Sequence, residues 1–153
     1  MHKLELKIPP PLVTAVAGAL MWLLAWMFPA LALAIPLQQP LALLLLGLGL
    51  VLPLVSVWLF IQAKTTIDPT RPGRSAQLVV SGFNRISRNP MYLGMLLVLL
   101  GWALWLSSLL ALLTAPLFVL YMNRFQIEPE ERFLTERFAE QYLAYKASVR
   151  RWI

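Results

Sequence analysis

Charged residues are absent from two long stretches of this chain. No Asp, Glu, Lys or Arg lies between Ile8 and Ala63, and none lies between Asn89 and Asn123. An unpaired charge at the centre of a bilayer costs about 3 kcal/mol or more, so membrane-spanning segments exclude such residues. The two stretches are therefore predicted to lie in a membrane.

The first stretch is long enough for two membrane-spanning helices. About 20 apolar residues are needed to cross a bilayer. We therefore predict spans at 12–34 and 41–61, joined by a short uncharged link. The first span is too long for the apolar part of a cleaved signal peptide, so a retained helix is predicted.

Proline and glycine positions add detail to these two helices. Pro29 and Pro53 are expected to kink the first and the second helix, because proline removes a backbone donor and clashes with the preceding turn. Gly47 and Gly49 are expected to let another helix approach the second one closely, since they carry no side chain.

The second apolar stretch is too long for one span and too short for two ordinary ones. Its 32 residues, 91–122, would form a helix of about 48 Å, whereas a bilayer core is about 30 Å thick. Ser107 and Ser108 lie at its centre. We predict two short helices, at 91–106 and 109–122, joined by a tight turn.

The distribution of basic residues sets the expected orientation. The loop 62–89 carries five basic residues and a single acidic one, Asp68, so the positive-inside rule places this loop in the cytoplasm. Four spans then put both termini in the cytoplasm; a fifth span is the alternative. The expected location is the plasma membrane of a bacterium or archaeon, with the chain crossing it several times.

The segment 128–153 is predicted to be an amphipathic cytoplasmic helix with a short tail. Pro129 suits the first turn of a helix. An apolar and aromatic stripe follows at helical spacing. The stripe consists of Leu134, Phe138, Tyr142 and Tyr145. It is expected to pack on the bilayer surface or on the bundle, and its tyrosines, with Trp152, are alternatively placed to stack on a flat base. The fold class predicted is an all-α integral membrane protein with one domain, 1–153.

Composition and charge exclude several classes of function. Hydrophobic residues make up 59% of the chain and charged residues 13%, against about a quarter charged in soluble domains. The net charge of +6 does not indicate a nucleic-acid partner, because the basic residues flank the predicted spans. The chain has no cysteine, and its one histidine is His2. No disulfide, no metal site and no catalytic triad is therefore expected.

Two polar segments flank the predicted hairpin of short helices. Arg88 and Asn89 precede Pro90, which is expected to start a helix whose free backbone N–H groups suit a carboxylate or phosphate. An ordinary interfacial cap with a positive-inside arginine explains the same residues, and spacing alone favours that explanation.

The second polar segment contains three glutamates. Glu128, Glu130 and Glu131 suit the positive end of a helix, and one of them could instead bind a ligand amine or ribose hydroxyls. Because antiparallel helices begin and end at the same face, we expect these glutamates to lie near Arg88. A salt bridge between Arg88 and a glutamate would satisfy both groups without a ligand.

An ordered set of residues within 64–151 carries a family resemblance. The set comprises Thr65, Thr66, Pro69, Arg71 and Pro72, then Leu78, Val79, Ser81 and Gly82, then 85–94, then Glu128, Glu131, Leu134, Phe138, Tyr142, Tyr145, Val149, Arg150 and Arg151. In this order it resembles the isoprenylcysteine carboxyl methyltransferase family, specifically its small bacterial and archaeal members.

The resemblance implies an integral-membrane methyltransferase that uses S-adenosylmethionine (SAM). The implied catalytic residues are Arg88, Glu131 and Arg150. The implied cofactor-binding residues are Arg88, Asn89, Pro90, Tyr92, Leu93, Gly94, Glu128, Glu131, Tyr142 and Tyr145. One departure is Asn89, where the eukaryotic pattern has histidine. Arg88 or a backbone N–H group would then hold the cofactor carboxylate in its place.

The chemistry implied by the resemblance needs no metal. Methyl transfer from a sulfonium is an in-line displacement that depends mainly on positioning and desolvation. The expected partners are membrane lipids and a lipophilic small-molecule or lipidated acceptor from the bilayer. An isoprenylcysteine-like carboxylate, which needs no general base, a thiol, an amine and a phospholipid head group are all open as the acceptor.

Two alternative functions remain at this stage. The first is a membrane reductase of the sterol-reductase type that uses NADPH, which would need further basic residues for the 2′-phosphate. The second is a non-catalytic membrane scaffold. It predicts a collapsed pocket in which Arg88 and the glutamates pair with each other.

Overall fold

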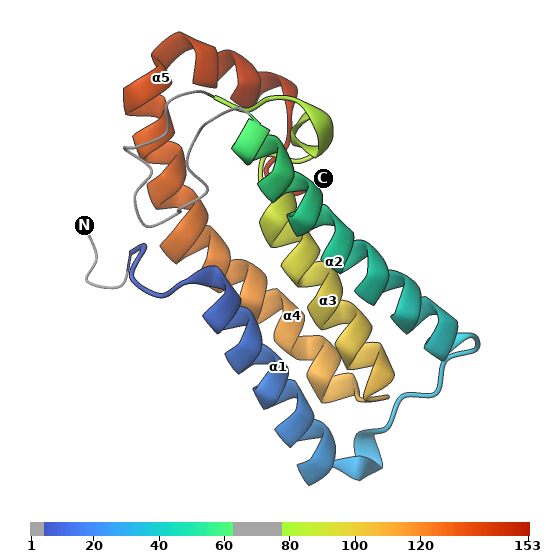
Figure 1. Ribbon diagram of the computed structural model, residues 1–153. Helices are drawn as coiled ribbons and strands as arrows, with labels where there is room; N and C mark the ends of the chain where they lie inside the picture. Colours follow the sequence, from blue (N-terminus) through green and yellow to red (C-terminus); the bar gives the residue numbers. More distant parts are fainter. Residues whose placement is uncertain (1–4, 63–77) are drawn as a thin grey trace.

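The computed structural model describes residues 5–62 and 78–153. Within these residues the chain is helical, without a strand, and a single isolated backbone bridge joins Ala32 to Ser108. The main helices are α1 (Pro10–Met27), α2 (Gln38–Gln62), α3 (Pro90–Trp105), α4 (Leu109–Met122) and α5 (Glu128–Ser148). Figure 1 shows α1 to α4 as a bundle, while α5 extends α4 and then turns across one end. The predicted all-α fold class is confirmed.

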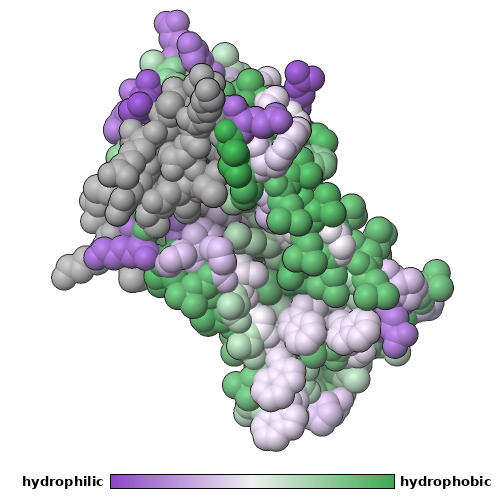
Figure 2. All heavy atoms as spheres, viewed as in Figure 1, coloured by the Kyte–Doolittle hydropathy of each residue, from purple (hydrophilic) through white to green (hydrophobic). Residues whose placement is uncertain are grey.

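The helices have the length and composition of membrane segments. In the described part of the chain, three helical segments are long and apolar enough to cross a membrane: Pro10–Met27, Gln38–Leu59 and Leu109–Ser148. α3 is apolar but shorter, with 16 residues. Figure 2 shows large hydrophobic areas on the outer surface of the bundle. Large apolar side chains such as Leu50 and Leu54 of α2 are exposed. The protein is an integral membrane protein.

Proline determines where α1 ends. The prediction extended this helix to residue 34, but it ends at Met27 and is followed by a short 3-10 turn, Pro29–Leu31. Phe28 has φ −127° and ψ 61° because a residue before proline is disfavoured in the helical conformation. α2 instead begins earlier than predicted, at Gln38, and Pro40 lies in its first turn, where proline is tolerated.

The predicted hairpin of short helices is present. α3 ends at Trp105 and α4 begins at Leu109, with Ser107 in the left-handed conformation (φ 54°). The Ser108 hydroxyl accepts a hydrogen bond from the N–H of Ala111 at 3.3 Å, which caps α4. The Gln38 amide donates to the Ser107 hydroxyl at 2.6 Å, so the start of α2 is held against the hairpin turn.

α2 packs along α3 through residues without side chains. A Cβ atom added at Gly49 would lie 2.7 Å from the carbonyl oxygen of Gly94 and 2.7 Å from the nitrogen of Val98, so the two backbones are in direct contact. Pro53 lies inside α2, with its ring against Gly94. Gly47 was expected to serve the same purpose, but a Cβ there would meet nothing within 4 Å.

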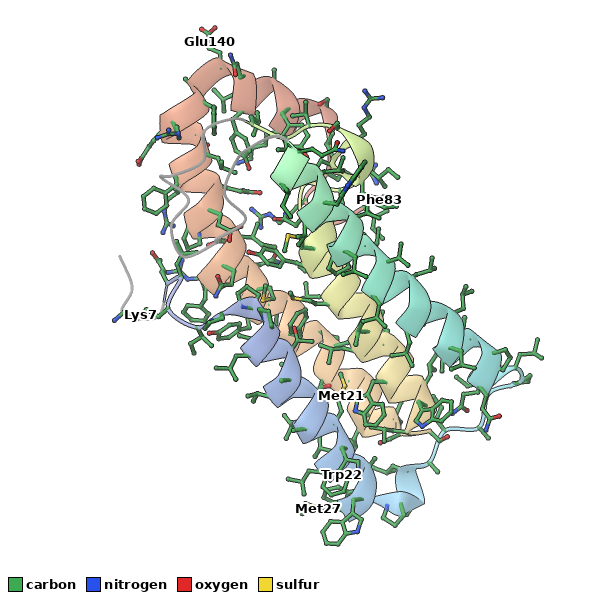
Figure 3. The ribbon with its side chains drawn as sticks, in the orientation of Figure 1. Lys7, Met21, Trp22, Met27, Phe83 and Glu140 are labelled. Atoms are coloured by element: carbon green, nitrogen blue, oxygen red, sulfur yellow. The ribbon has the colours of Figure 1, made fainter. Side chains whose placement is uncertain are left out.

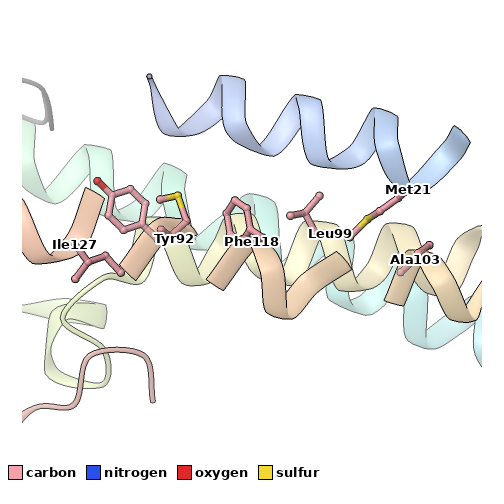
Figure 4. Packing of buried hydrophobic residues seen from close by; sticks show 8 residues of the cluster. Met21, Tyr92, Leu99, Ala103, Phe118 and Ile127 are labelled. Atoms are coloured by element: carbon pink, nitrogen blue, oxygen red, sulfur yellow. The ribbon is translucent and has the colours of Figure 1, made fainter. Parts of the chain in front are cut away.

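The interior of the bundle lies between α1, α3 and α4. Figure 4 shows this core, in which Leu99 of α3 lies between Met21 of α1 and Phe118 of α4. The indole N–H of Trp102 donates to the carbonyl of Gly18 at 3.1 Å and joins α3 to α1. Figure 3 shows apolar Trp22 at the end of α1 that lies far from α5.

α5 does not run straight. Ala139 inside it has φ 42° and ψ −117°, a conformation that residues other than glycine rarely adopt. The bend returns the second half of α5 over the ends of α2 and α3 (Figure 1). Of the predicted loop 62–89, Gln62 is the last residue of α2, and the described residues 78–89 contain a 3-10 turn, Gly82–Arg85.

The contact between α2 and α3 predicts a difference between two glycine substitutions in α2. Gly49→Ala is expected to destabilise the protein by about 1–3 kcal/mol, because the new methyl group has to push the α3 backbone away. Gly47→Ala adds the same group in open space and should be neutral or slightly stabilising. Thermal unfolding of the detergent-solubilised variants measures both effects. Equal melting temperatures for the two variants would contradict this account of the contact.

Candidate functional site

The joint between α4 and α5 is an unusual helical turn. A π-helical segment, Asn123–Ile127, connects the two helices into one run. Turns of this kind are frequent at functional sites. The side chain of Gln126 in this segment is fully buried and donates to the carbonyl of Ile8 at 2.7 Å. Glu5 binds Arg132 at 2.6 Å, so the chain before α1 is tied to the same joint.

Glu131, in the first turn of α5, is the centre of a charge cluster. Its carboxylate lies 2.7 Å from Arg88, 2.9 Å from Arg151 and 3.4 Å from Lys146. The side chains of Arg88 and Glu131 are each only 8% exposed. A buried carboxylate requires such partners, because desolvation of an unpaired charge is costly.

Arg88 joins the start of α3 to the segment that follows α5. Its guanidinium donates to the carbonyl of Val149 at 2.7 Å, and its backbone N–H donates to the carbonyl of Arg150 at 3.0 Å. The side-chain amide of Asn89 donates to the carbonyl of Arg151 at 2.9 Å. Residues 88–89 and 149–151 therefore lie side by side, held by both main-chain and side-chain groups.

The charge cluster shifts two pKa values in opposite directions. Burial alone would raise the pKa of Glu131, but hydrogen bonds from Arg151 and Arg88 and their charges outweigh it, so the pKa is lowered. The hydrogen bond to Glu131 likewise raises the pKa of Arg151, against the effect of its own burial. Both groups are therefore held in their charged forms.

Glu130 has a different environment from its neighbour. Its carboxyl group accepts a hydrogen bond from the hydroxyl of Tyr92 on α3 at 2.5 Å. Burial raises the pKa of Glu130 to about 8; the hydrogen bond from Tyr92 lowers it, and the negative charge of Glu131 raises it further. Two adjacent carboxyl groups thus have pKa values on opposite sides of the ordinary one.

A groove of about 510 Å³ lies beside the charge cluster. Its walls come from one face of α5 and from the segment after it, and they carry charges of both signs. The lining residues are Glu128, Glu131, Arg132, Thr135, Glu136, Lys146 and Arg151. This volume falls within the range of about 300–1,000 Å³ that is typical of small-molecule sites.

The structure brings some of the predicted site residues together. Arg88 and Glu131 form the expected ion pair, Asn89 lies beside Arg88, and Glu128 lines the groove. The remaining predicted residues on α3 lie in its buried first turns and do not line the groove. These residues are Pro90, Tyr92, Leu93 and Gly94. Of the loop that carried the first part of the resemblance, 65–72 lies outside the described residues.

The two tyrosines of α5 were predicted to contact the cofactor, yet both are buried. Tyr142 is 2% and Tyr145 is 9% exposed, and the Tyr145 hydroxyl donates to the carbonyl of Asn84 at 2.6 Å. Tyr145 thereby attaches α5 to the segment before α3, and the ring of Tyr142 lies against that of Tyr145 with centroids 6.2 Å apart. The Trp152 indole donates to the side-chain carbonyl of Asn123 at 3.0 Å, so it too is engaged within the protein.

The neighbouring arginines Arg150 and Arg151 differ in their contacts, and the one that was not predicted as a site residue contacts Glu131. The side chain of Arg150 is exposed, whereas the side chain of Arg151 binds Glu131 through two nitrogens, at 2.9 and 3.2 Å. Lys146 and Arg132 were also missed. A signal for the groove was available, because Glu128, Arg132 and Glu136 recur at a spacing of four and share one helix face.

Because this charge cluster is buried, we predict that removing the Glu131 carboxylate at its centre strongly lowers the stability of the protein. Glu131→Ala should destabilise the protein by about 3–5 kcal/mol, because Arg88 would be left buried without its partner. Glu128→Ala is the matched control and should cost less than about 1 kcal/mol, since its pair with Arg124 is well exposed. Chemical unfolding in detergent measures both.

The dependence of protein stability on pH provides a second test of the role of Glu131. The pKa of Glu131 is lower in the folded protein than its ordinary value of 4.5, so its stabilising contribution is complete above that pH. The contribution is lost as the pH falls through the folded value. The difference in stability between the wild type and Glu131→Gln should therefore shrink in acid, and a pH-independent difference would contradict this assignment.

Comparisons with known proteins identify the family of this chain. An uncharacterized protein of Haemophilus influenzae is 49% identical over 63 residues, which are 41% of this chain and 100% of that protein. No solved structure matches the chain. Residues 37–141 match the phospholipid methyltransferase family, which includes isoprenylcysteine carboxyl methyltransferase-like proteins. Because this match covers more than half of the sequence, the chain belongs to the phospholipid methyltransferase family of membrane methyltransferases.

Proposed function

We propose that this protein is a SAM-dependent methyltransferase that transfers a methyl group in line to a lipophilic acceptor at the membrane. The observation that carries the proposal is the groove beside Glu131, which is lined by charges of both signs. The groove lies where the polar helix α5 leaves the apolar bundle. Family membership supports the reaction class.

The residues of the groove fit the chemistry of SAM. The cofactor has a carboxylate, an ammonium group, ribose hydroxyls and a sulfonium. Lys146 and Arg151 suit the carboxylate, whereas Glu128 and Glu136 suit the ammonium or the hydroxyls. The Nε of Arg88 is buried and has no hydrogen-bond partner among the described residues. When bound, the cofactor supplies an activated methyl group.

The residues of the chain contribute positioning and exclusion of water. Arg88 fixes Glu131, and Glu131 fixes Arg151, so the charged wall is rigid before any ligand binds. Arg151 takes the role that the resemblance suggested for Arg150.

The acceptor is proposed to reach the site from the bilayer. Asn89, which contacts the segment after α5, directly precedes the apolar helix α3, so the charge cluster lies at the membrane boundary. We propose that this end of the bundle faces the cytoplasm, as the basic residues on this side suggest, and that the membrane is the plasma membrane of a bacterium or archaeon. The phospholipid methyltransferase name of the family suggests a phospholipid head group as the acceptor, and its isoprenylcysteine carboxyl methyltransferase-like members suggest a carboxylate resembling isoprenylcysteine.

The non-catalytic scaffold is the second candidate, favoured by one observation. It predicts that Arg88 pairs with a glutamate, and Arg88 does pair with Glu131. It also predicts a collapsed pocket, whereas a groove of about 510 Å³ lies beside the pair. The reductase alternative predicts binding of NADPH, and family membership favours the methyl donor instead.

Binding of SAM by the detergent-solubilised protein tests the proposal. Calorimetry should detect binding of SAM and of S-adenosylhomocysteine to the wild type. Glu131→Gln and Arg88→Ala should weaken this binding at least tenfold, or about 1.4 kcal/mol, because the charged wall loses its anchor. Glu140→Gln makes the same chemical change on the exposed side of α5 and should leave the affinity unchanged. Absence of binding to the wild type at millimolar ligand would refute the proposal.

A further inference from the structure

The segment before α1 is attached by its backbone to the joint between α4 and α5. The N–H of Leu6 donates to the carbonyl of Phe125 at 3.0 Å, and the side-chain amide of Gln126 donates to the carbonyl of Ile8 at 2.7 Å. Leu6 is itself buried, at 8% exposure. Figure 1 shows this segment beside the joint. These contacts hold the segment in place independently of the charge of Glu5.

Glu5 is a buried carboxylate that is paired with two partly exposed arginines. Its side chain is 3% exposed and lies 2.6 Å from Arg132 and 3.6 Å from Arg124. The side chains of these arginines are 51% and 42% exposed. Burial of a carboxylate is costly even when it is paired, and the backbone contacts already hold the segment. Anchoring of the segment alone therefore does not explain why a charge lies at this position.

Glu5 changes the charge balance of one wall of the groove. Four charged residues recur at a spacing of four along the run of α4 and α5, and their signs alternate and cancel. They are Arg124, Glu128, Arg132 and Glu136, of which the last three line the groove. Glu5 joins this row from the segment before α1, so that three carboxylates face two guanidinium groups. Because its charge is buried, salt screens it less than the exposed charges of the row.

We propose that Glu5 is a positioning residue of the groove, which holds Arg132 and neutralises its charge, so that the groove binds a cationic ligand in preference to a neutral one. Glu5 does not line the groove and acts through Arg132, which does. This inference rests on the proposed use of SAM and adds a residue from the segment before α1 to the machinery of the site.

The methyl donor and its product differ in charge. SAM carries a sulfonium and an ammonium group against one carboxylate, so its net charge is positive. S-adenosylhomocysteine has lost the sulfonium charge together with the methyl group and is neutral overall. A wall with a net negative charge stabilises the first ligand more than the second. Glu5 therefore favours binding of the methyl donor and release of the product.

Binding of the two ligands to a variant of Glu5 tests the inference. Glu5→Gln leaves the charge of Arg132 less compensated, so at low ionic strength the affinity for SAM should fall about three- to tenfold, while that for S-adenosylhomocysteine should change less than about twofold. Calorimetry on the detergent-solubilised full chain measures both dissociation constants. Glu140→Gln, on the exposed side of α5, is the matched control and should change neither. An equal loss for the two ligands, which a merely structural role would give, would overturn the inference.

A double variant separates the charge of Glu5 from its packing. Glu5→Gln combined with Arg132→Gln removes both charges of the ion pair, so the ratio of the two dissociation constants should return to within about twofold of the wild-type ratio. Arg132→Gln alone makes the wall more negative and should shift the ratio in favour of SAM. These two variants decide the question even if Glu5→Gln does not fold. A double variant that remains shifted, or a ratio that does not respond to Arg132→Gln, would overturn the inference.

The outcomes distinguish this inference from the proposed function. If the wild type binds neither ligand, both fail. If the wild type binds both ligands and their ratio is the same in the Glu5 and Arg132 variants, the inference alone fails and the use of SAM stands. Glu5→Asp keeps the carboxylate at this position and should retain the preference for SAM, so a loss of the preference in this variant would also contradict the role of the charge.

Discussion

The buried ion pair between Arg88 and Glu131 is the interaction on which the polar end of this protein depends. A charge at 8% exposure is stable only with a close partner, so each of these residues requires the other. Arg88 also binds the carbonyl of Val149, and Glu131 also binds Arg151. One guanidinium and one carboxylate therefore fix the start of α3, the start of α5 and the segment after α5, which are distant in the sequence.

The membrane part of the fold follows from a different constraint. Lipid is as apolar as the helix surfaces, so association of the helices depends on close contact rather than on burial from water. Gly49 and Gly94 provide such contact between α2 and α3. α4 and α5 instead form one helical run that leaves the apolar region through the π-helical segment Asn123–Ile127. This run brings a rigid polar helix to the edge of the bundle.

Much of the architecture could be predicted because charged residues are excluded from a bilayer. This exclusion leaves long stretches of the sequence without any charged residue. The hairpin was predictable from the length of one block and from Ser107, and the pairing of Arg88 with a glutamate followed from antiparallel helices. The burial of Tyr145 and the contact of Arg151 with Glu131 were not predictable. Both features depend on the bend in α5 at Ala139. Alanine is the strongest helix former, so the residue type at this position gave no indication of a bend.

The position of Arg88 between distant partners also has a consequence for biosynthesis. Arg88 leaves the ribosome well before Glu131 and the segment 149–151, and until then its guanidinium has none of the partners that it has in the folded protein. During that interval it has to remain hydrated at the membrane surface, which holds the start of α3 at the boundary while the hairpin inserts. Arg88, which later holds the charge cluster together, can thus first limit how deeply the start of α3 enters the membrane.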